Sequence, residues 1–334
     1  MRYYMAPAGK ARADRVPTRA SYDKGCIMHI TPHLPPPPPE YASAEWCKVE
    51  TNAAEMEKFR QGLPETEILG SYTTAWPEAR TPRAMSSQGP MAFRIRGKLQ
   101  ARHQCSTLLV EPIYSDASES STQELGLEQL VAKIWDPKLM LYEDAMYTNP
   151  MLLCQRTYST EVNAYRQLKG LEEMPTFHGS FITTIDDDDG ERIAGLILIS
   201  FVNGVQISAL QMVPEKLFVD LLAMDMKMMM REIAYTDYRT ENILAVDGSR
   251  LVLVDYGEAT PSPGIPAYVE EEAMVTRWAT NFCEEEDMMK LVGSKGNVDP
   301  YPEVDRQWVR GLVQQAMEKL PKRRGKKRKC KVDA

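Results

Sequence analysis

The chain has 334 residues, of which 43% are hydrophobic and 26% are charged, a composition typical of a globular protein of one or two domains. Its formal net charge of −7 argues against a general nucleic-acid binder. No apolar run approaches the roughly 18 residues that a membrane span needs, the basic N-terminus lacks the apolar stretch of a secretory signal, and the six cysteines show no CxxC spacing. We therefore expect an intracellular protein with reduced thiols and no membrane association.

The first ninety residues are rich in proline, with five consecutive prolines at 35–39. Proline fixes φ and lacks a backbone donor, so this run favours an extended polyproline conformation. We expect a disordered Pro-rich N-terminal region over residues 1–90, with one short helical pattern at 43–61. The proline run either docks in an aromatic-lined groove of a partner or acts as a spacer.

Ordered structure is expected from Met91 onward. Strands rich in β-branched residues are predicted at 93–96, 106–113, 129–135, 177–185 and 193–201, and an Asp-rich turn ending at Gly190 joins the last two as a hairpin. Helices are predicted at 158–171 and, rich in methionine, at 214–233, and a short hairpin at 242–245 and 250–254. This order predicts an α+β fold over residues 91–320, with a sheet-rich first lobe and a helical second lobe.

The composition changes again at Pro321. The ten residues from Lys322 to Lys331 include eight basic ones. We expect residues 321–334 to form a disordered basic tail, which is either simply solvated or binds an import factor or nucleic acid. Cytoplasm and nucleus both stay open as locations.

Four segments of the second half bring together side chains suited to phosphate chemistry. Asp237 and Asn242 lie five residues apart on a loop after a helix, and Asp255 follows an apolar strand and precedes Tyr-Gly. Asn242 and Asp255 offer the oxygen ligands that Mg²⁺ prefers, while Asp237 would accept a hydroxyl proton. Lys133 on a strand and Glu161 on a helix are expected to form an ion pair that holds the lysine towards nucleotide phosphates.

Taken singly, these residues have ordinary explanations. A lysine in a strand is usually an edge residue, a glutamate on a helix is usually solvated, and Asp-Tyr-Gly is usually a turn. Their order along the chain and their placement on strand, helix and loop are much more specific. Agreement across these levels favours a kinase-type fold.

The segments 130–137 (LVAKIWDP), 161–168 (EVNAYRQL), 236–244 (TDYRTENIL) and 253–259 (LVDYGEA) resemble the protein-kinase-like fold, most closely the compact, divergent kinase-like proteins of filamentous fungi. The resemblance covers about residues 91–263 and implies two lobes with ATP between them. It implies that Lys133 contacts phosphates with Glu161 as its helix partner and that Asp237 is the catalytic base. It further implies a γ-phosphate contact by Arg239, metal binding by Asn242 and Asp255, and an adenine-binding hinge formed by Ser200, Phe201, Val202 and Asn203.

The chain departs from this family at three places. The region from Ile95 to Val110 holds a single glycine, Gly97, where a glycine-rich loop would cover the phosphates. Tyr235 and Thr236 replace the His and Arg that usually precede the catalytic Asp, and the second lobe is abbreviated.

Three functions therefore remain. The first is an ATP- and Mg²⁺-dependent phosphotransferase of protein-kinase type acting on a hydroxyl, with Ser/Thr as the expected acceptor. The second is a catalytically weak or inactive pseudokinase that serves as a binding scaffold. The third is a small-molecule kinase similar to aminoglycoside phosphotransferases.

Overall fold

The computed structural model describes residues 22–35, 91–101, 105–113, 129–136, 150–187, 190–210, 213–261, 271–284 and 306–320. The chain is a mixed α/β structure of two compact units, of which unit 1 comprises Met1–Asn203 and Asp255–Thr260 and unit 2 comprises Gly204–Val254 and Pro261–Ala334. The helix expected at 43–61, most of the proline run and the basic tail lie outside the described residues. Within the described ranges, no helix is both long and apolar enough to cross a membrane.

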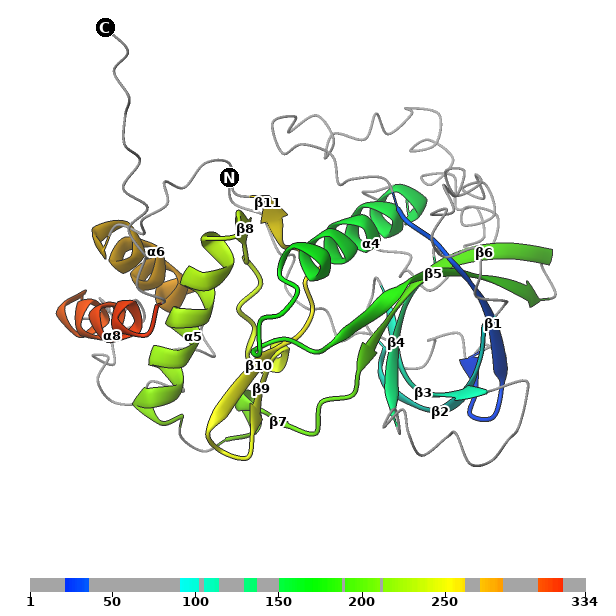
Figure 1. The fold of residues 1–334 in the computed structure, drawn as a ribbon, viewed down its shortest axis with the longest axis horizontal. Helices are drawn as coiled ribbons and strands as arrows, with labels where there is room; N and C mark the ends of the chain where they lie inside the picture. The colour runs from blue at the N-terminus through cyan, green and yellow to red at the C-terminus, as the bar shows by residue number, and fades with distance from the viewer. Residues whose placement is uncertain are drawn as a thin grey trace, which may run out of the picture. The chain divides into compact units, whose positions relative to one another are not determined.

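Six antiparallel strands of unit 1 close into a barrel (Figure 1). They are β1 (Ile27–Pro32), β2 (Met91–Ala101), β3 (Ser106–Ile113), β4 (Leu130–Trp135), β5 (Phe177–Asp187) and β6 (Gly190–Ser200). Around the barrel they follow the order β1-β2-β3-β4-β6-β5, and β5 and β6 form the hairpin that the sequence predicts. Because the barrel is closed, each of these strands has a paired neighbour on both sides.

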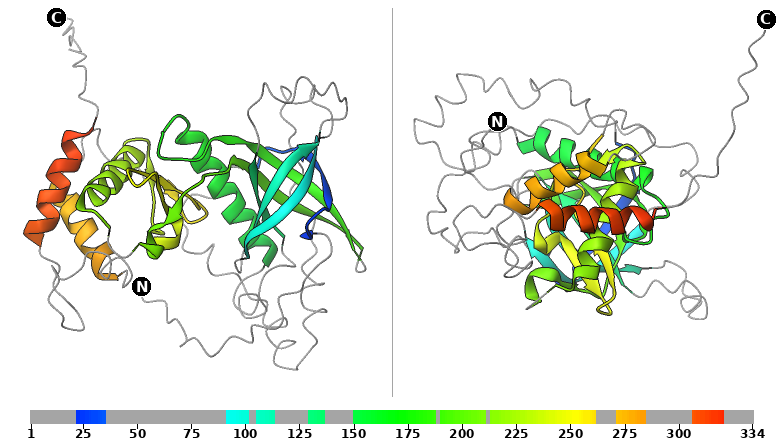
Figure 2. Two further views of the ribbon diagram at one scale, coloured as in Figure 1. Left: turned by 90° about the horizontal axis from the view of Figure 1, so that it is seen from below. Right: turned by 90° about the vertical axis from the view of Figure 1, so that its left-hand side faces the viewer.

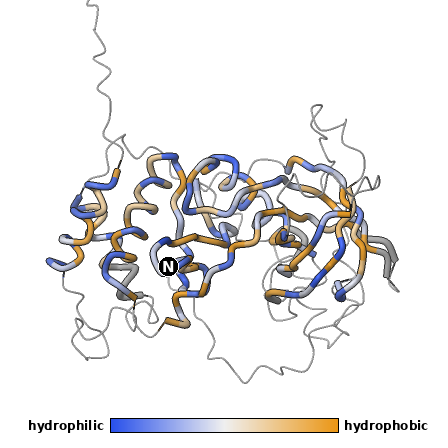
Figure 3. Tube along the Cα trace, turned by 60° about the horizontal axis from the view of Figure 1, so that its bottom comes forward, coloured by the Kyte–Doolittle hydropathy of each residue, from blue (hydrophilic) through white to orange (hydrophobic). Residues whose placement is uncertain are grey.

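Strand alternation fills the barrel with apolar side chains, and Figure 3 shows the apolar stretches along its strands. In β4, Ala132 and Ile134 belong to this core. Successive side chains of a strand point to opposite faces, so Lys133 and Trp135 lie on the outer face of the barrel. All six residues of β4 are nevertheless buried, because helix α4 (Pro150–Gln167) packs against β4, β5 and β6.

The structure differs from the sequence-based expectation at β1, which lies inside the range expected to be disordered. β1 pairs with β2 on one side and with β5 on the other, so it completes the barrel (Figure 2). Met28 and Ile30 point into the core while Ile27 and His29 are exposed, a period-two pattern present in the sequence IMHITP. The neighbouring prolines concealed this pattern, and the pairing partners lie far away in the sequence.

The segment after β1 contacts helix α4. His33 is buried, stacks on the ring of Tyr158 with 5.7 Å between ring centroids, and its Nδ1 lies 2.9 Å from the Tyr158 hydroxyl. That hydroxyl donates to the carbonyl of Phe181 in β5, and Ser180 donates to the carbonyl of His33. These bonds join the N-terminal segment, α4 and β5 through buried polar groups that all have partners.

Helix α4 starts earlier and ends earlier than predicted. It begins at Pro150, which suits the first helical position because the missing N–H needs no partner there. It ends at Gln167, shortly before Gly170, whose φ of 84° terminates the helix. The predicted apolar face, formed by Val162, Tyr165 and Leu168, is buried.

Unit 2 combines a small sheet with three helices in its described part. Strands β10 (Arg250–Leu253), β9 (Ile243–Val246) and β7 (Val205–Gln206) pair in that order. Helix α8 (Arg306–Glu318) packs on α5 (Glu215–Met229) and α6 (Glu271–Glu284), as Figure 2 shows. The short elements are η5 (Ile207–Ala209), β8 (Ile233–Ala234), η6 (Thr240–Asn242) and β11 (Thr260–Pro261).

The predicted Met-rich helix is a core helix. In α5, Met224, Met226, Met228 and Met229 are buried, whereas Met230, just after the helix, is 39% exposed. Unbranched thioether side chains adapt to the irregular space between α5 and its neighbours.

The integration of β1 into the barrel can be tested with two isoleucines of the same strand. Ile30 is 1% exposed and Ile27 is 51% exposed. We expect Ile30→Ala to lower the free energy of unfolding by about 2–5 kcal/mol, because it opens a cavity in the barrel. Ile27→Ala should change it by less than about 0.5 kcal/mol. Urea unfolding of both variants measures the difference, and equal effects would show that β1 is not part of the folded core.

The burial of His33 predicts a pH dependence of stability. Burial lowers the pKa of His33 from 6.5 to about 4. Between these values the unfolded chain binds a proton that the folded chain does not, so stability falls as the pH falls from 6.5 towards 4. His33→Asn, which cannot titrate, should show a smaller loss over this range in thermal unfolding. The matched control is His29→Asn, the same substitution at an exposed position of β1.

Candidate active site

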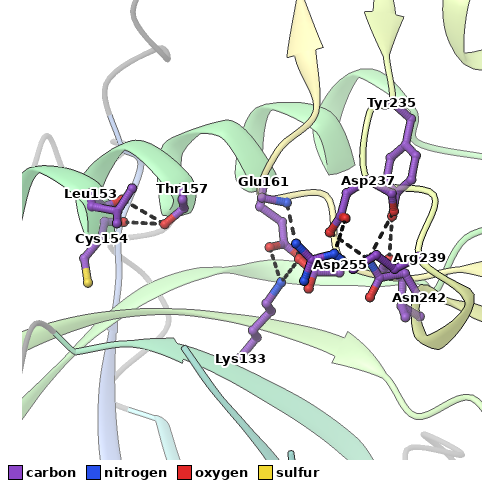
Figure 4. A network of polar contacts seen from close by, with 12 residues as sticks. Lys133, Leu153, Cys154, Thr157, Glu161, Tyr235, Asp237, Arg239, Asn242 and Asp255 are labelled. Atoms are coloured by element: carbon purple, nitrogen blue, oxygen red, sulfur yellow. Dashed lines mark hydrogen bonds and ion pairs between the residues drawn. The ribbon is translucent and has the colours of Figure 1, made fainter. Parts of the chain in front are cut away.

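Lys133 lies at the centre of a buried charge cluster in unit 1 (Figure 4). Its Nζ is 2.5 Å from Glu161 Oε2 and 2.5 Å from Asp255 Oδ1. The Lys133 side chain is 8% exposed, the Glu161 side chain is fully buried and that of Asp255 is 19% exposed. The expected Lys133–Glu161 ion pair is therefore present, and Asp255 joins it from the turn after β10.

The position of Glu161 on α4 follows from the helix periodicity. Tyr158, Val162 and Tyr165 place one face of α4 against the barrel, and Glu161 lies on this same face. Trp135, two residues after Lys133 on β4, packs on Tyr158 of α4 with 5.4 Å between the ring centroids. Lys133 and Glu161 are thus held by a strand and a helix, while Asp255 comes from the turn after β10.

Asp255 adopts a backbone conformation that is rare for a residue with a side chain. Its φ is 70°, in the left-handed region, which Asp tolerates better than most residues. Its Oδ1 also accepts a hydrogen bond from the N–H of Gly257 at 3.5 Å, as in an Asx turn. A Cβ at Gly257 would lie 3.5 Å from Asp255 Oδ1 and 3.6 Å from Glu161 Oε2, so a side chain there would cover both carboxylates.

The charges in the cluster depend on each other. Burial lowers the pKa of Lys133, but the carboxylates of Asp255 and Glu161 outweigh this effect and raise the pKa above its ordinary value. Burial raises the pKa of Glu161 to about 7, since the charge of Lys133 offsets only part of the cost of desolvation. With both carboxylates ionised, the cluster carries one excess negative charge.

The second group of candidate residues lies in unit 2, on the loop after β8 and on η6, which ends at Asn242 (Figure 4). Asn242 Nδ2 donates to Asp237 Oδ2 at 2.8 Å and to the Asp237 carbonyl at 3.2 Å. Arg239 Nε lies 2.9 Å from Asp237 Oδ1, so each carboxylate oxygen of Asp237 has a donor. Arg239 is half-exposed, and its partner in the structure is this carboxylate.

Backbone bonds fix this loop to the end of β10. Asn242 is fully buried, its N–H donates to the carbonyl of Arg239, and its carbonyl accepts from the N–H of Val254 at 2.8 Å. The hydroxyl of Tyr235 donates to the carbonyl of Val254 at 3.3 Å. Asp255 is the next residue in the chain after Val254, so the two candidate metal ligands are linked through a short stretch of backbone.

The four expected hinge residues, 200–203, begin at Ser200, the last residue of β6. Ser200 N–H donates to the carbonyl of Thr176, and its hydroxyl lies 2.8 Å from Nε2 of His178. Phe201 N–H donates to the carbonyl of Gln129, and the Phe201 side chain is 36% exposed. Val202 and Asn203 then continue without regular secondary structure to the end of this part of unit 1.

Asp225 is a further buried carboxylate, which was not predicted from the sequence. It lies in the middle of α5, is fully buried, and is contacted by Arg277 and Trp278 of α6 and by Tyr238 next to Asp237. The one sign of it in the sequence is an acidic residue inside the apolar run of α5. Among the described residues, no group of three or more His, Cys, Asp or Glu side chains could hold a metal ion by itself.

Comparisons with known proteins give little beyond the structure itself. No protein-family model matches the chain, and no curated protein matches it. Among solved structures 1164 chains match, one of them described as a co-crystal structure of WbdD and the kinase inhibitor LY294002. This match has 11% sequence identity and a TM-score of 0.40, and covers 73% of this chain but only 49% of that one. At this TM-score the similarity supports no inference about this chain.

The charge cluster predicts how removal of its cation affects stability. Lys133→Met keeps the apolar stem but leaves two carboxylates without their common partner. At pH 8 we expect the free energy of unfolding to fall by about 3–5 kcal/mol. The loss should be smaller at pH 5.5, because the raised pKa of Glu161 lets the folded state take up a proton that the unfolded state does not.

The control for this experiment is Lys98→Met in the exposed part of β2. Urea unfolding at both pH values should show little change for Lys98→Met. A pH-independent loss in Lys133→Met would contradict the electrostatic explanation.

Proposed function

We propose that the protein is a phosphotransferase of protein-kinase type that uses ATP and Mg²⁺ and transfers the γ-phosphoryl group to a hydroxyl. The observation that carries the proposal is Lys133, a nearly buried ammonium group fixed between Glu161 and Asp255. A lysine held in this way needs no further reorganisation before it meets a phosphate oxygen. Preorganised charges of this kind supply most of the rate in phosphoryl transfer.

The donor set around the proposed nucleotide site suits Mg²⁺. The metal prefers a few hard oxygen ligands together with phosphate oxygens and water, which the Asp255 carboxylate and the Asn242 side-chain carbonyl would provide. Since the amide nitrogen of Asn242 donates to Asp237, its oxygen is the atom assigned to the metal. The excess negative charge of the Lys133 cluster also favours an added cation. When bound, Mg²⁺ would neutralise charge on the β- and γ-phosphates.

Asp237 is the residue proposed to accept the proton of the acceptor hydroxyl. Asn242 and Arg239 each donate to one of its oxygens, so the carboxylate is held in a fixed orientation. We assign to Arg239 the contact with the γ-phosphate, because its side chain is half-exposed and can leave Asp237 when an anion binds. The backbone of Ser200, Phe201, Val202 and Asn203 is proposed to face the adenine.

One observation favours a second candidate, a nucleotide-binding scaffold with little turnover. The segment expected to cover the phosphates, from Ile95 to Val110, contains a single glycine, Gly97. In the structure β2 shifts register on both sides of Gly97, between Ile95 and Gly97 and between Lys98 and Gln100, so the hairpin is irregular there. Side chains keep a backbone further from phosphates than glycines do, which reduces nucleotide affinity and turnover.

The proposal predicts Mg²⁺-dependent ATP binding that requires Asp255. In calorimetric titration, wild type should bind ATP more tightly with Mg²⁺ than without it, because the metal links the carboxylate to the phosphates. Asp255→Asn should lose this difference and also lose transfer of labelled γ-phosphate to a generic protein acceptor. The matched control is Asp247→Asn, because Asp247 also has a positive φ, 51°, but lies exposed in the β9–β10 turn.

A companion variant separates catalysis from binding. Asp237→Asn should bind ATP as wild type does, yet lower turnover by about 10²–10⁴-fold, because the amide cannot accept the hydroxyl proton. If ATP binds wild type but neither Asp237→Asn nor Asp255→Asn changes phosphate transfer above background, the scaffold is the correct reading. If wild type fails to bind ATP with or without Mg²⁺, both candidates are wrong.

A further inference from the structure

The buried carboxylate of Asp225 accepts hydrogen bonds from two separate segments of unit 2, the loop after β8 and helix α6. The hydroxyl of Tyr238 donates to its Oδ1, and Trp278 Nε1 donates to Oδ2 at 3.0 Å. Arg277 Nε donates to Oδ2 at 3.1 Å, with a longer contact of 3.4 Å from Nη2 to Oδ1. Both oxygens of this fully buried group are therefore engaged, as a buried charge requires.

Arg277 extends this network to the loop that carries Asp237. Its Nη2 donates to the carbonyl of Tyr235 at 2.5 Å, two residues before Asp237. The guanidinium also lies over the ring of Tyr238, 5.9 Å from its centroid, and Tyr238 is the residue after Asp237. The network thus holds the Tyr235 carbonyl before Asp237 and the Tyr238 side chain after it, while the Asp237 side chain contacts Asn242 and Arg239.

Stability alone is a weak reason for such a network. Burying an ion pair costs desolvation energy, and well-packed apolar residues of similar size often give equal or greater stability. The aromatic side chains of Tyr235, Tyr238 and Trp278 already pack against each other, with ring centroids 4.9 Å and 4.7 Å apart. The polar bonds add direction, because a planar guanidinium fixes the carbonyl and the carboxylate that it joins.

We infer that Asp225 and Arg277 are positioning residues that hold the loop of residues 235–238 so that the Asp237 carboxylate is correctly placed. The inference rests on the proposed function, in which Asp237 accepts the hydroxyl proton. It also accounts for the loop sequence, where Tyr235 and Thr236 stand in place of the His and Arg expected before the catalytic Asp. The bond from Arg277 on α6 fixes this backbone from outside the loop.

The test replaces the network by apolar side chains. The double variant Asp225→Leu, Arg277→Met leaves no unpaired buried charge, so it should still fold. Its unfolding midpoint should fall, because the Tyr238 hydroxyl, Trp278 Nε1 and the Tyr235 carbonyl lose these partners. Its kcat for phosphate transfer should fall about 10–100-fold, because a displacement of about 1 Å at a reacting group has this effect. Its KM for ATP should change much less than its kcat, since none of residues 235–238 is itself assigned to the nucleotide or the metal. Arg310→Met on α8, which removes an exposed pair with Glu272, is the matched control and should change neither.

A second readout does not depend on activity. Hydrogen exchange of the backbone amides at 235–238 should become faster in the double variant, while exchange in α8 stays unchanged. Arg277→Lys keeps the charge, but lysine has no planar fork to reach both Asp225 and the Tyr235 carbonyl. Its kcat should therefore fall, by less than that of the double variant.

An unchanged kcat and unchanged exchange at 235–238 in the double variant would overturn the inference. So would a fall in kcat that only follows the fraction unfolded. If wild type transfers no phosphate, the proposed function fails, and the exchange result still decides whether the network positions the loop.

Discussion

The contact of Lys133 with Glu161 and Asp255 constrains most of unit 1. An ammonium group removed from water is tolerated only where carboxylates stay in contact with it, so strand β4, helix α4 and the turn after β10 must keep their mutual positions. The same constraint explains why Asp255 holds a strained φ of 70°. The attraction of the lysine compensates a backbone conformation that would relax if the cation were absent.

The barrel and α4 supply the rigidity that this cluster needs. Strand β4 is buried on both faces, by the core on one side and by α4 on the other, so Lys133 cannot turn to solvent. The N-terminal segment supports the cluster indirectly, because His33 contacts Tyr158, which lies one helical turn before Glu161 on α4. Residues 22–35 therefore support the charge cluster although they contribute no side chain to it.

The sequence predicted these features unequally, for physical reasons. The Lys133–Glu161 pair was foreseeable because a strand followed by an amphipathic helix brings those positions together, and the structure contains the pair. The ordered β1 was not foreseen, because its pairing with β2 and β5 is non-local and its proline-rich surroundings suggested disorder. Asp225 was missed because the partners that make a buried carboxylate tolerable, Arg277 and Trp278, come from a helix about fifty residues later in the chain. The catalytic and metal-binding roles assigned from the sequence remain proposals.

The closure of the barrel by β1 has a consequence for self-association. β2 and β5 are each paired on one side by β1, so loss of that strand would leave two rows of unpaired backbone N–H and C=O groups facing a vacant position. Such edges recruit extended chains, from another molecule if none is available within the same one. A polypeptide that starts at Met91 would therefore tend to exchange strands or aggregate, and a detached peptide spanning residues 22–35 would be its natural solubilising partner.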